Sequence, residues 1–122
     1  MPDVNNLLWF FFRFSGRVNR SAYVLGFLLL GVVASFPLYQ FMRFEGMPGA
    51  DGWAVLFSAS LIITIWGHLA ISVKRLHDLD KPGLFAIALA IPVISIIAFV
   101  ALCVLPGAPG PNGYGATTNS PR

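Results

Sequence analysis

Charged residues are scarce in this chain of 122 residues, at 11% of the sequence, whereas an ordinary soluble domain carries about 25%. Hydrophobic residues make up 57%. A fold in water could not cover its surface with so few charges, so the composition excludes an ordinary soluble domain and indicates a membrane protein. The length allows one domain, residues 1–122.

Cysteine is almost absent too, because Cys103 stands alone. One thiol can form neither an intrachain disulfide nor a cysteine metal cage. The sequence also contains no nucleophile elbow, phosphate-binding glycine loop or zinc signature. The basic residues are few and flank apolar runs, which argues against nucleic-acid binding. We therefore expect no cofactor, no metal and no enzymatic activity.

What the chain does have is long uncharged runs. A spanning helix needs about 20 apolar residues, and three stretches reach that length, at about 21–42, 53–73 and 84–105. The sequence thus predicts an all-α integral membrane protein with three transmembrane helices. Asn19 is a candidate N-cap of the first span, and Pro92 lies inside the third.

Both ends of the chain lie outside these spans. An aromatic segment at about 7–14 is too short to cross a bilayer, and it suits either the headgroup zone or packing against the helix bundle. Residues 106–122 are rich in proline and glycine, which excludes a continuing helix and predicts an irregular tail.

Basic residues are distributed unevenly around the spans. Six of them flank one side, and two flank the other: Arg13, Arg17, Arg20, Lys74, Arg75 and Lys81 against Arg43 and Arg122. The positive-inside rule then places the N-terminus and the 74–83 loop in the cytoplasm, where the basic groups can attract anionic lipid. Three spans place the tail outside, whereas a half-hairpin at Pro92 would return it to the cytoplasmic side.

A polar stripe runs along the second span, formed by Ser60, Thr64, His68 and Ser72. Their spacing of four residues puts them on one helix face, which should turn toward protein or water. His68 is either a proton relay or ligand contact, or a neutral histidine bonded across a helix interface. We favour the interface, because no acidic residue lies within any span.

His77, Asp78 and Asp80 form a second polar cluster, after that span. A histidine beside two carboxylates can indicate a metal or an acid-base pair, but neighbouring helix residues point to different faces and no further ligand is close. We favour a structural role for Asp78 or Asp80, either ion pairing with Arg75, Lys74 or an arginine of the first segment, or capping of the start of the third span.

Four motifs resemble a bacterial inner-membrane family, the YhaH-like proteins of domain of unknown function 805. They are Phe14-Ser-Gly-Arg-Val-Asn-Arg-Ser-Ala-Tyr23, Lys74-Arg-Leu-His-Asp-Leu-Asp-Lys-Pro-Gly83, Pro106 with Gly107 and Gly110, and Gly110-Pro-Asn-Gly-Tyr-Gly115. The resemblance implies a small, multi-pass protein of the bacterial inner membrane and supplies no activity. By position, the residues that match the motifs are Arg17, Arg20, Arg75, His77, Asp78, Asn112 and Tyr114.

Two hypotheses for function follow. The first is association with itself, with lipid or with an envelope complex, suggested by small residues on the first span at Gly26, Gly31 and Ala34. The alternative is a subunit of a small oligomeric transporter or channel, in which the polar stripe lines the path. A membrane enzyme using His77 and Asp78 ranks last.

Overall fold

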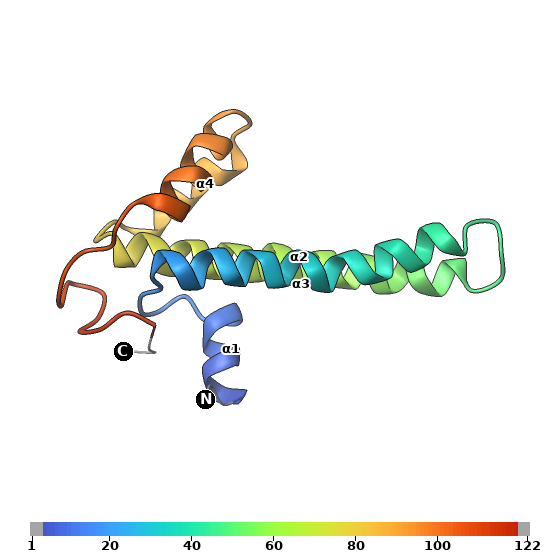
Figure 1. Ribbon diagram of the computed structural model, residues 1–122, viewed down its shortest axis with the longest axis horizontal. Coiled ribbons are helices and arrows are strands. Elements are labelled where there is room, and N and C mark those ends of the chain that lie inside the picture. Colours follow the sequence, from blue (N-terminus) through green and yellow to red (C-terminus); the bar gives the residue numbers. More distant parts are fainter. Residues whose placement is uncertain (1–3, 120–122) are drawn as a thin grey trace.

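The protein is a long antiparallel helix pair with shorter segments attached near one end, seen in a computed structural model that describes residues 4–119 (Figure 1). The helix pair consists of α2 (Arg20–Arg43) and α3 (Ala50–Asp78). Helix α1 (Val4–Phe12) lies across it on one side, and the 3₁₀ helix η1 (Gly83–Ala90) and α4 (Ile94–Val104) project from it on the other.

Helices α2 and α3 are long enough and apolar enough to cross a membrane. Their 24 and 29 residues correspond to about 36 and 44 Å, against a hydrocarbon core of about 30 Å. They cover the first two expected spans. Large apolar side chains point outward along both, such as Leu25 at 66% exposure and Ile62 at 70%, which suits contact with acyl chains.

Local sequence explains where these helices begin and turn. Asn19 caps α2 as expected, because its side-chain oxygen accepts a hydrogen bond of 2.9 Å from the Ala22 N–H. Between the helices, Gly46 and Gly49 adopt positive φ, a conformation that costs glycine nothing. The loop therefore reverses the chain within a few residues.

The expected third span differs from the structure. Instead of one helix over 84–105, the chain forms the 8-residue η1 and then the 11-residue α4, with a break at residues 91–93. Pro92 lacks an N–H and disfavours helical backbone at Ile91, which is extended with ψ 121°. Val93 then takes φ 54°, so the chain folds back on itself.

The tail consequently returns to the end of the helix pair that carries Arg17 and Asp78 (Figure 1). At about 16 Å, α4 is too short to cross a hydrocarbon core. Three spans would have placed the tail on the side of the membrane opposite the N-terminus. The structure instead brings the tail back to the end of the helix pair that carries Arg17. Within residues 106–119 the tail is irregular, as predicted, and residues 120–122 lie outside the described range.

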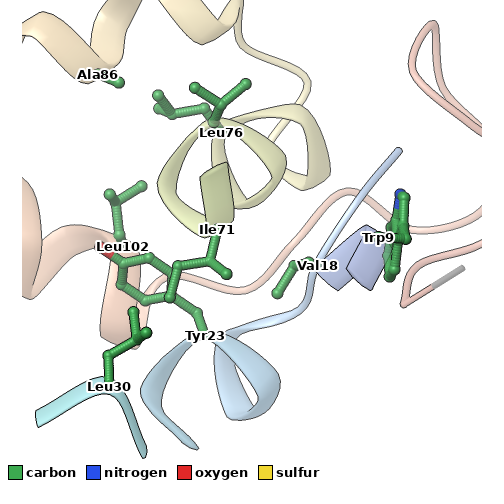
Figure 2. Close-up of a cluster of buried hydrophobic side chains, with 9 residues drawn as sticks. Trp9, Val18, Tyr23, Leu30, Ile71, Leu76, Ala86 and Leu102 are labelled. Carbon is green, nitrogen blue, oxygen red and sulfur yellow. The ribbon is translucent and has the colours of Figure 1, made fainter. Parts of the chain in front are cut away.

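The buried apolar core sits at this same end (Figure 2). It joins α1, the segment before α2, both long helices, η1 and α4. Its members are Trp9, Val18, Tyr23, Leu30, Ile71, Val73, Leu76, Ala86 and Leu102. Trp9 is 6% exposed, whereas Leu7 and Leu8 on the same helix are 46% and 50% exposed. One face of α1 therefore packs against the bundle, as one of the two readings of the aromatic segment predicted.

Candidate functional site

Asp78 lies at the centre of a buried polar cluster at the end of α3. Its Oδ1 accepts a hydrogen bond from Arg17 Nε at 3.0 Å, and its Oδ2 accepts one from Arg75 Nη1 at 2.9 Å. The three side chains are no more than 3% exposed. The expected pairing of Asp78 with Arg75 and with an arginine of the first segment is thus present. We call Arg17, Arg75, His77, Asp78 and the tail residues 107–115 around them the polar junction.

The remaining donors of both arginines bind backbone carbonyls. Arg17 Nη1 donates to the carbonyls of Gly110 at 2.7 Å and Gly115 at 3.1 Å, and its Nη2 donates to Ala108 at 2.9 Å. Arg75 Nε donates to the Leu102 carbonyl at 2.7 Å, and its Nη2 donates to Leu105. Arg17 therefore fastens the tail to the helix pair, and Arg75 fastens the end of α4.

The tail backbone packs directly against Asp78. The Ala108 N–H donates to the Asp78 carbonyl at 2.7 Å. A Cβ at position 107 would collide with the Asp78 carboxylate. Position 107 therefore has room only for glycine, and the tail backbone packs against the Asp78 carboxylate.

His77, Asn112 and Tyr114 form the outer layer of the polar junction. The His77 and Tyr114 rings stack with centroids 4.1 Å apart and planes 2° apart. Asn112 Nδ2 donates to the His77 carbonyl at 2.9 Å, and its Oδ1 accepts from the Tyr114 N–H at 2.8 Å. His77 Nδ1 lies 3.0 Å from the Gly16 carbonyl oxygen. His77 thus links the segment before α2 to the tail.

Lys74 connects the same end to α1. Its Nζ donates to the carbonyls of Trp9 and Phe10 at the C-terminal end of that helix, where orphan carbonyls and the helix dipole favour a cation. The ammonium also lies 4.5 Å from the Trp9 ring centroid. Lys74 is fully buried, so its role is to dock α1.

Charge at this end is unevenly balanced. Arg17, Lys74 and Arg75 are buried with a single buried carboxylate, Asp78. Removing one partner of a buried ion pair leaves an uncompensated charge, which is costly. The carbonyls of the tail and of α1 accept hydrogen bonds from Arg17 and Lys74 and so help to stabilise these buried cations. Within residues 4–119, no three His, Cys, Asp or Glu residues are grouped so that they could hold a metal ion.

Seven of the eight residues singled out from the sequence meet at this end. Arg20 belongs to it through a 2.8 Å hydrogen bond from Nη1 to the Val104 carbonyl. His68 is the exception, because it lies about 9 Å further along α3 from Lys74. Its ring is surrounded by Tyr23, Phe27 and Phe99.

The polar stripe does not act as one unit. Ser72 is buried and hydrogen-bonded to Tyr23 at 2.9 Å between the hydroxyls, while Ser60 donates to the Phe57 carbonyl of its own helix. His68 Nδ1 is buried without a hydrogen-bond partner among residues 4–119. The cross-helix bond that we favoured for His68 is therefore absent from the described residues and is formed by Ser72 instead.

Sequence reasoning missed Lys74 and Gly107 as individual contributors. From the sequence, Lys74 is a determinant of membrane orientation and a candidate partner of a carboxylate, whereas its contacts in the structure are with the carbonyls at the end of α1. The sequence offered one indication for Gly107, which is that it belongs to the motif of Pro106, Gly107 and Gly110. Spacing alone could not reveal that a tail some 30 residues away approaches Asp78.

These observations define a small helical membrane protein with two candidate spans, in which the polar junction holds the tail and Lys74 holds α1 at the same end. The chain belongs to the family described as "Protein of unknown function (DUF805)", whose model matches residues 11–116. The match runs from α1 to the tail and so includes every residue of the polar junction.

Two relatives from Escherichia coli strain K12 agree with this assignment. "Inner membrane protein YhaH" is 28% identical over 102 residues, covering 84% of each chain. "Inner membrane protein YhaI" is 29% identical over 110 residues, covering 89% of this chain and 86% of the relative. No solved structure gives a significant match.

Proposed function

We propose that this protein is a two-span inner-membrane protein that acts by association, not catalysis, and that the end bearing the polar junction faces the cytoplasm. There its exposed basic side chains hold anionic lipid. The η1–α4 hairpin enters one leaflet from that end without crossing it.

The observation that carries the proposal is how the basic residues divide. Arg17, Lys74 and Arg75 are buried and bound to protein groups. The other three at that end are exposed: Arg13, Arg20 and Lys81. Each exposed cation contributes about 1 kcal/mol of attraction to an anionic leaflet. The buried cations already bind protein groups, so the exposed ones are the cations that can contact anionic lipid.

We favour lipid over a partner helix because most of the small residues of α2 are already packed within the chain. Gly26 packs within the chain, since a Cβ there would touch Phe10 and Ile71, and Ala34 is buried. The small-residue face expected to bind another helix is therefore largely occupied inside the chain. Gly31 alone of the three meets open space.

Orientation is tested with topology reporters in the living bacterium. One reporter is fused after Arg122, and another is inserted in the loop near Gly46, at the far end of the helix pair. We expect cytoplasmic activity from the first and periplasmic activity from the second. Periplasmic activity of the C-terminal fusion would contradict the proposed two-span topology.

Lipid binding is tested by purification in mild detergent and native mass spectrometry with phosphatidylglycerol or phosphatidylcholine. We expect the wild type to retain phosphatidylglycerol preferentially and the double variant Arg13→Gln, Lys81→Gln to lose that preference. Both side chains are exposed, so the fold is retained. Arg43→Gln, at the far end, is the matched control and keeps the preference. Equal retention of both lipids by the wild type would refute lipid holding.

A further inference from the structure

Two attached segments make the molecule wider in one half of its length than in the other. Figure 1 shows α1 on one side of the α2–α3 pair, and η1 with α4 on the other side, both near the polar junction. Toward the loop at residues 44–49 the helix pair continues alone within the described residues 4–119. The cross-section of the protein therefore changes along the axis of the two long helices.

Contacts place α1 beside the junction half of the uncharged stretch 53–73 of α3. The Phe12 carbonyl accepts a hydrogen bond of 3.1 Å from Trp66 Nε1, and a Cβ at Gly67 would lie 3.6 Å from the Phe11 carbonyl oxygen. Trp66 lies about 12 Å along α3 from Lys74, whereas one leaflet contributes about 15 Å to the hydrocarbon core. In a membrane, α1 therefore stays within the leaflet at the junction end.

The η1–α4 hairpin reaches a similar depth on the other side of the helix pair. Leu89 and Ala90, at the end of η1, line a cleft together with Thr64 and His68 of α3. The Phe99 ring of α4 has its centroid 5.9 Å from that of His68. Thr64 and His68 lie about 15 Å and about 9 Å along α3 from Lys74. The hairpin thus ends near the middle of the bilayer, in the same leaflet as α1.

Both segments turn apolar side chains away from the helix pair. Leu7 and Leu8 are exposed on α1, and Val93, Ile96 and Ile97 are exposed on the hairpin. At the depth of these segments, acyl chains surround such side chains. Removing apolar surface from water stabilises the inserted position of both segments.

Inserted segments take up area in the leaflet that holds them. A helix is about 10–12 Å across, so α1 and the hairpin displace lipid at the junction end. In the described part of the chain, the opposite leaflet accommodates α2 and α3 alone. Unequal areas bend a bilayer so that the wider leaflet becomes convex, and binding through helices inserted in one leaflet depends on curvature. By linkage, a protein that bends a membrane binds better where the membrane is already bent in that direction.

We propose that α1 and the η1–α4 hairpin form a wedge in the leaflet at the junction end, and that the protein accumulates where this leaflet is convex. With the polar junction in the cytoplasm, these are places where the inner membrane bulges toward the cytoplasm. The wedge requires the two-span topology proposed above and does not require anionic lipid.

Membrane tubes pulled from giant vesicles test the wedge, because the vesicle body is almost flat and the tube is strongly curved. The full chain carries a dye on Met47→Cys in the loop, where Met47 is exposed, and Cys103→Ser removes the native thiol. Vesicles of phosphatidylcholine alone exclude attraction to anionic lipid. A quencher that cannot cross the membrane is added outside.

The fluorescence that survives comes from molecules whose loop is inside the vesicle and whose polar junction lies on the outer leaflet, which is convex in the tube. We expect the ratio of this fluorescence to that of a lipid dye to be higher in the tube than in the vesicle body, and to rise as the tube narrows. The fluorescence lost on quenching comes from the opposite orientation. Its ratio should be lower in the tube than in the body.

Two matched double variants locate the effect. Ile96→Gln with Ile97→Gln makes the outer face of α4 polar, so that the hairpin sits less deeply in the leaflet. Val55→Gln with Leu56→Gln makes the same change near the far end of α3. All four side chains are exposed, so their replacement leaves the internal packing intact. We expect the α4 variant to lose enrichment in the tube and the α3 variant to retain it.

Equal ratios in tube and body for the protected wild type would overturn the proposal. So would enrichment of both orientations, because a preference for curvature of either sign needs no wedge, or undiminished enrichment of a folded α4 variant. If the α4 variant fails to fold, Leu7→Gln with Leu8→Gln on α1 replaces it and should lose enrichment in the same way. The topology reporters after Arg122 and near Gly46 test the two-span arrangement separately. Reporter activities as expected, without enrichment in the tube, would reject the wedge alone.

Discussion

The two ends of the α2–α3 pair are held together by different forces. At one end, buried Arg17 and Arg75 share Asp78, and Arg17 holds the tail while Arg75 holds the end of α4. At the other, Glu45 and Asp51 are exposed, and neither enters one of the ion pairs formed within residues 4–119. The far end has a glycine-bearing loop and outward apolar side chains, such as Val55 at 68% exposure.

This difference indicates that protein contacts and the bilayer stabilise different parts of the molecule. In the proposed two-span topology the membrane supplies the environment for the exposed apolar side chains along the helix pair, and few internal contacts are needed. Segments that do not span must be positioned by the protein itself, and backbone carbonyls of a proline- and glycine-rich tail can be held only by donors. The arginines supply these donors at one end and are not needed at the other.

The largest expected effect comes from removing the carboxylate that the arginines share. Asp78→Asn keeps the shape of the side chain but leaves Arg17 and Arg75 buried without their counter-charge. We expect a loss of about 3–5 kcal/mol in the free energy of unfolding, measured by denaturant titration in detergent micelles. Asp51→Asn, at the exposed start of α3, should change it by less than about 0.5 kcal/mol. Equal effects of both substitutions would contradict the claim that buried ion pairs stabilise one end of the helix pair and not the other.

A smaller loss is expected where the tail touches Asp78. In Gly107→Ala the new methyl group would collide with the carboxylate, while Gly113→Ala, in the same tail, meets open space. Overpacking of this kind costs about 1–3 kcal/mol. Hydrogen exchange of the tail amides, monitored by mass spectrometry, should rise for Gly107→Ala and stay unchanged for Gly113→Ala. Unchanged protection in both variants would show that the tail is not held against Asp78.

The sequence predicted the helix pair well because apolar length is a local property. The expected spans at 21–42 and 53–73 fall within α2 and α3, and the Asn19 cap formed as its side-chain chemistry indicated. Residues 84–105 were different, since their composition is the same on both sides of Pro92. Whether a proline bends a helix or ends it depends on neighbours that are distant in the sequence.

The residues of the candidate site could be predicted from the sequence, but their contacts with the tail could not. Pairing of Asp78 with Arg75 is local, three residues apart on one helix. The contacts of Arg17 with carbonyls beyond residue 107 required the tail to return to the same end, and three spans placed it at the other. His68 does lie at a helix interface, against Tyr23, Phe27 and Phe99. Within residues 4–119, however, its Nδ1 has no hydrogen-bond partner, whereas Ser72 is hydrogen-bonded to Tyr23.

The smallest expected effect compares two tyrosines on α2. Tyr23 is fully buried near the polar junction and its hydroxyl lies 2.9 Å from that of Ser72, whereas Tyr39, toward the far end, is 62% exposed. Tyr23→Phe removes one buried hydrogen bond between the two long helices and should cost about 1 kcal/mol. Tyr39→Phe should remain within about 0.5 kcal/mol of the wild type. Denaturant titration of both variants, combined with Ser72→Ala in a double-mutant cycle, measures the bond itself. A coupling energy near zero would mean that the helix pair is held by apolar packing alone even beside the polar junction, because the hydroxyl pair would then add nothing to it.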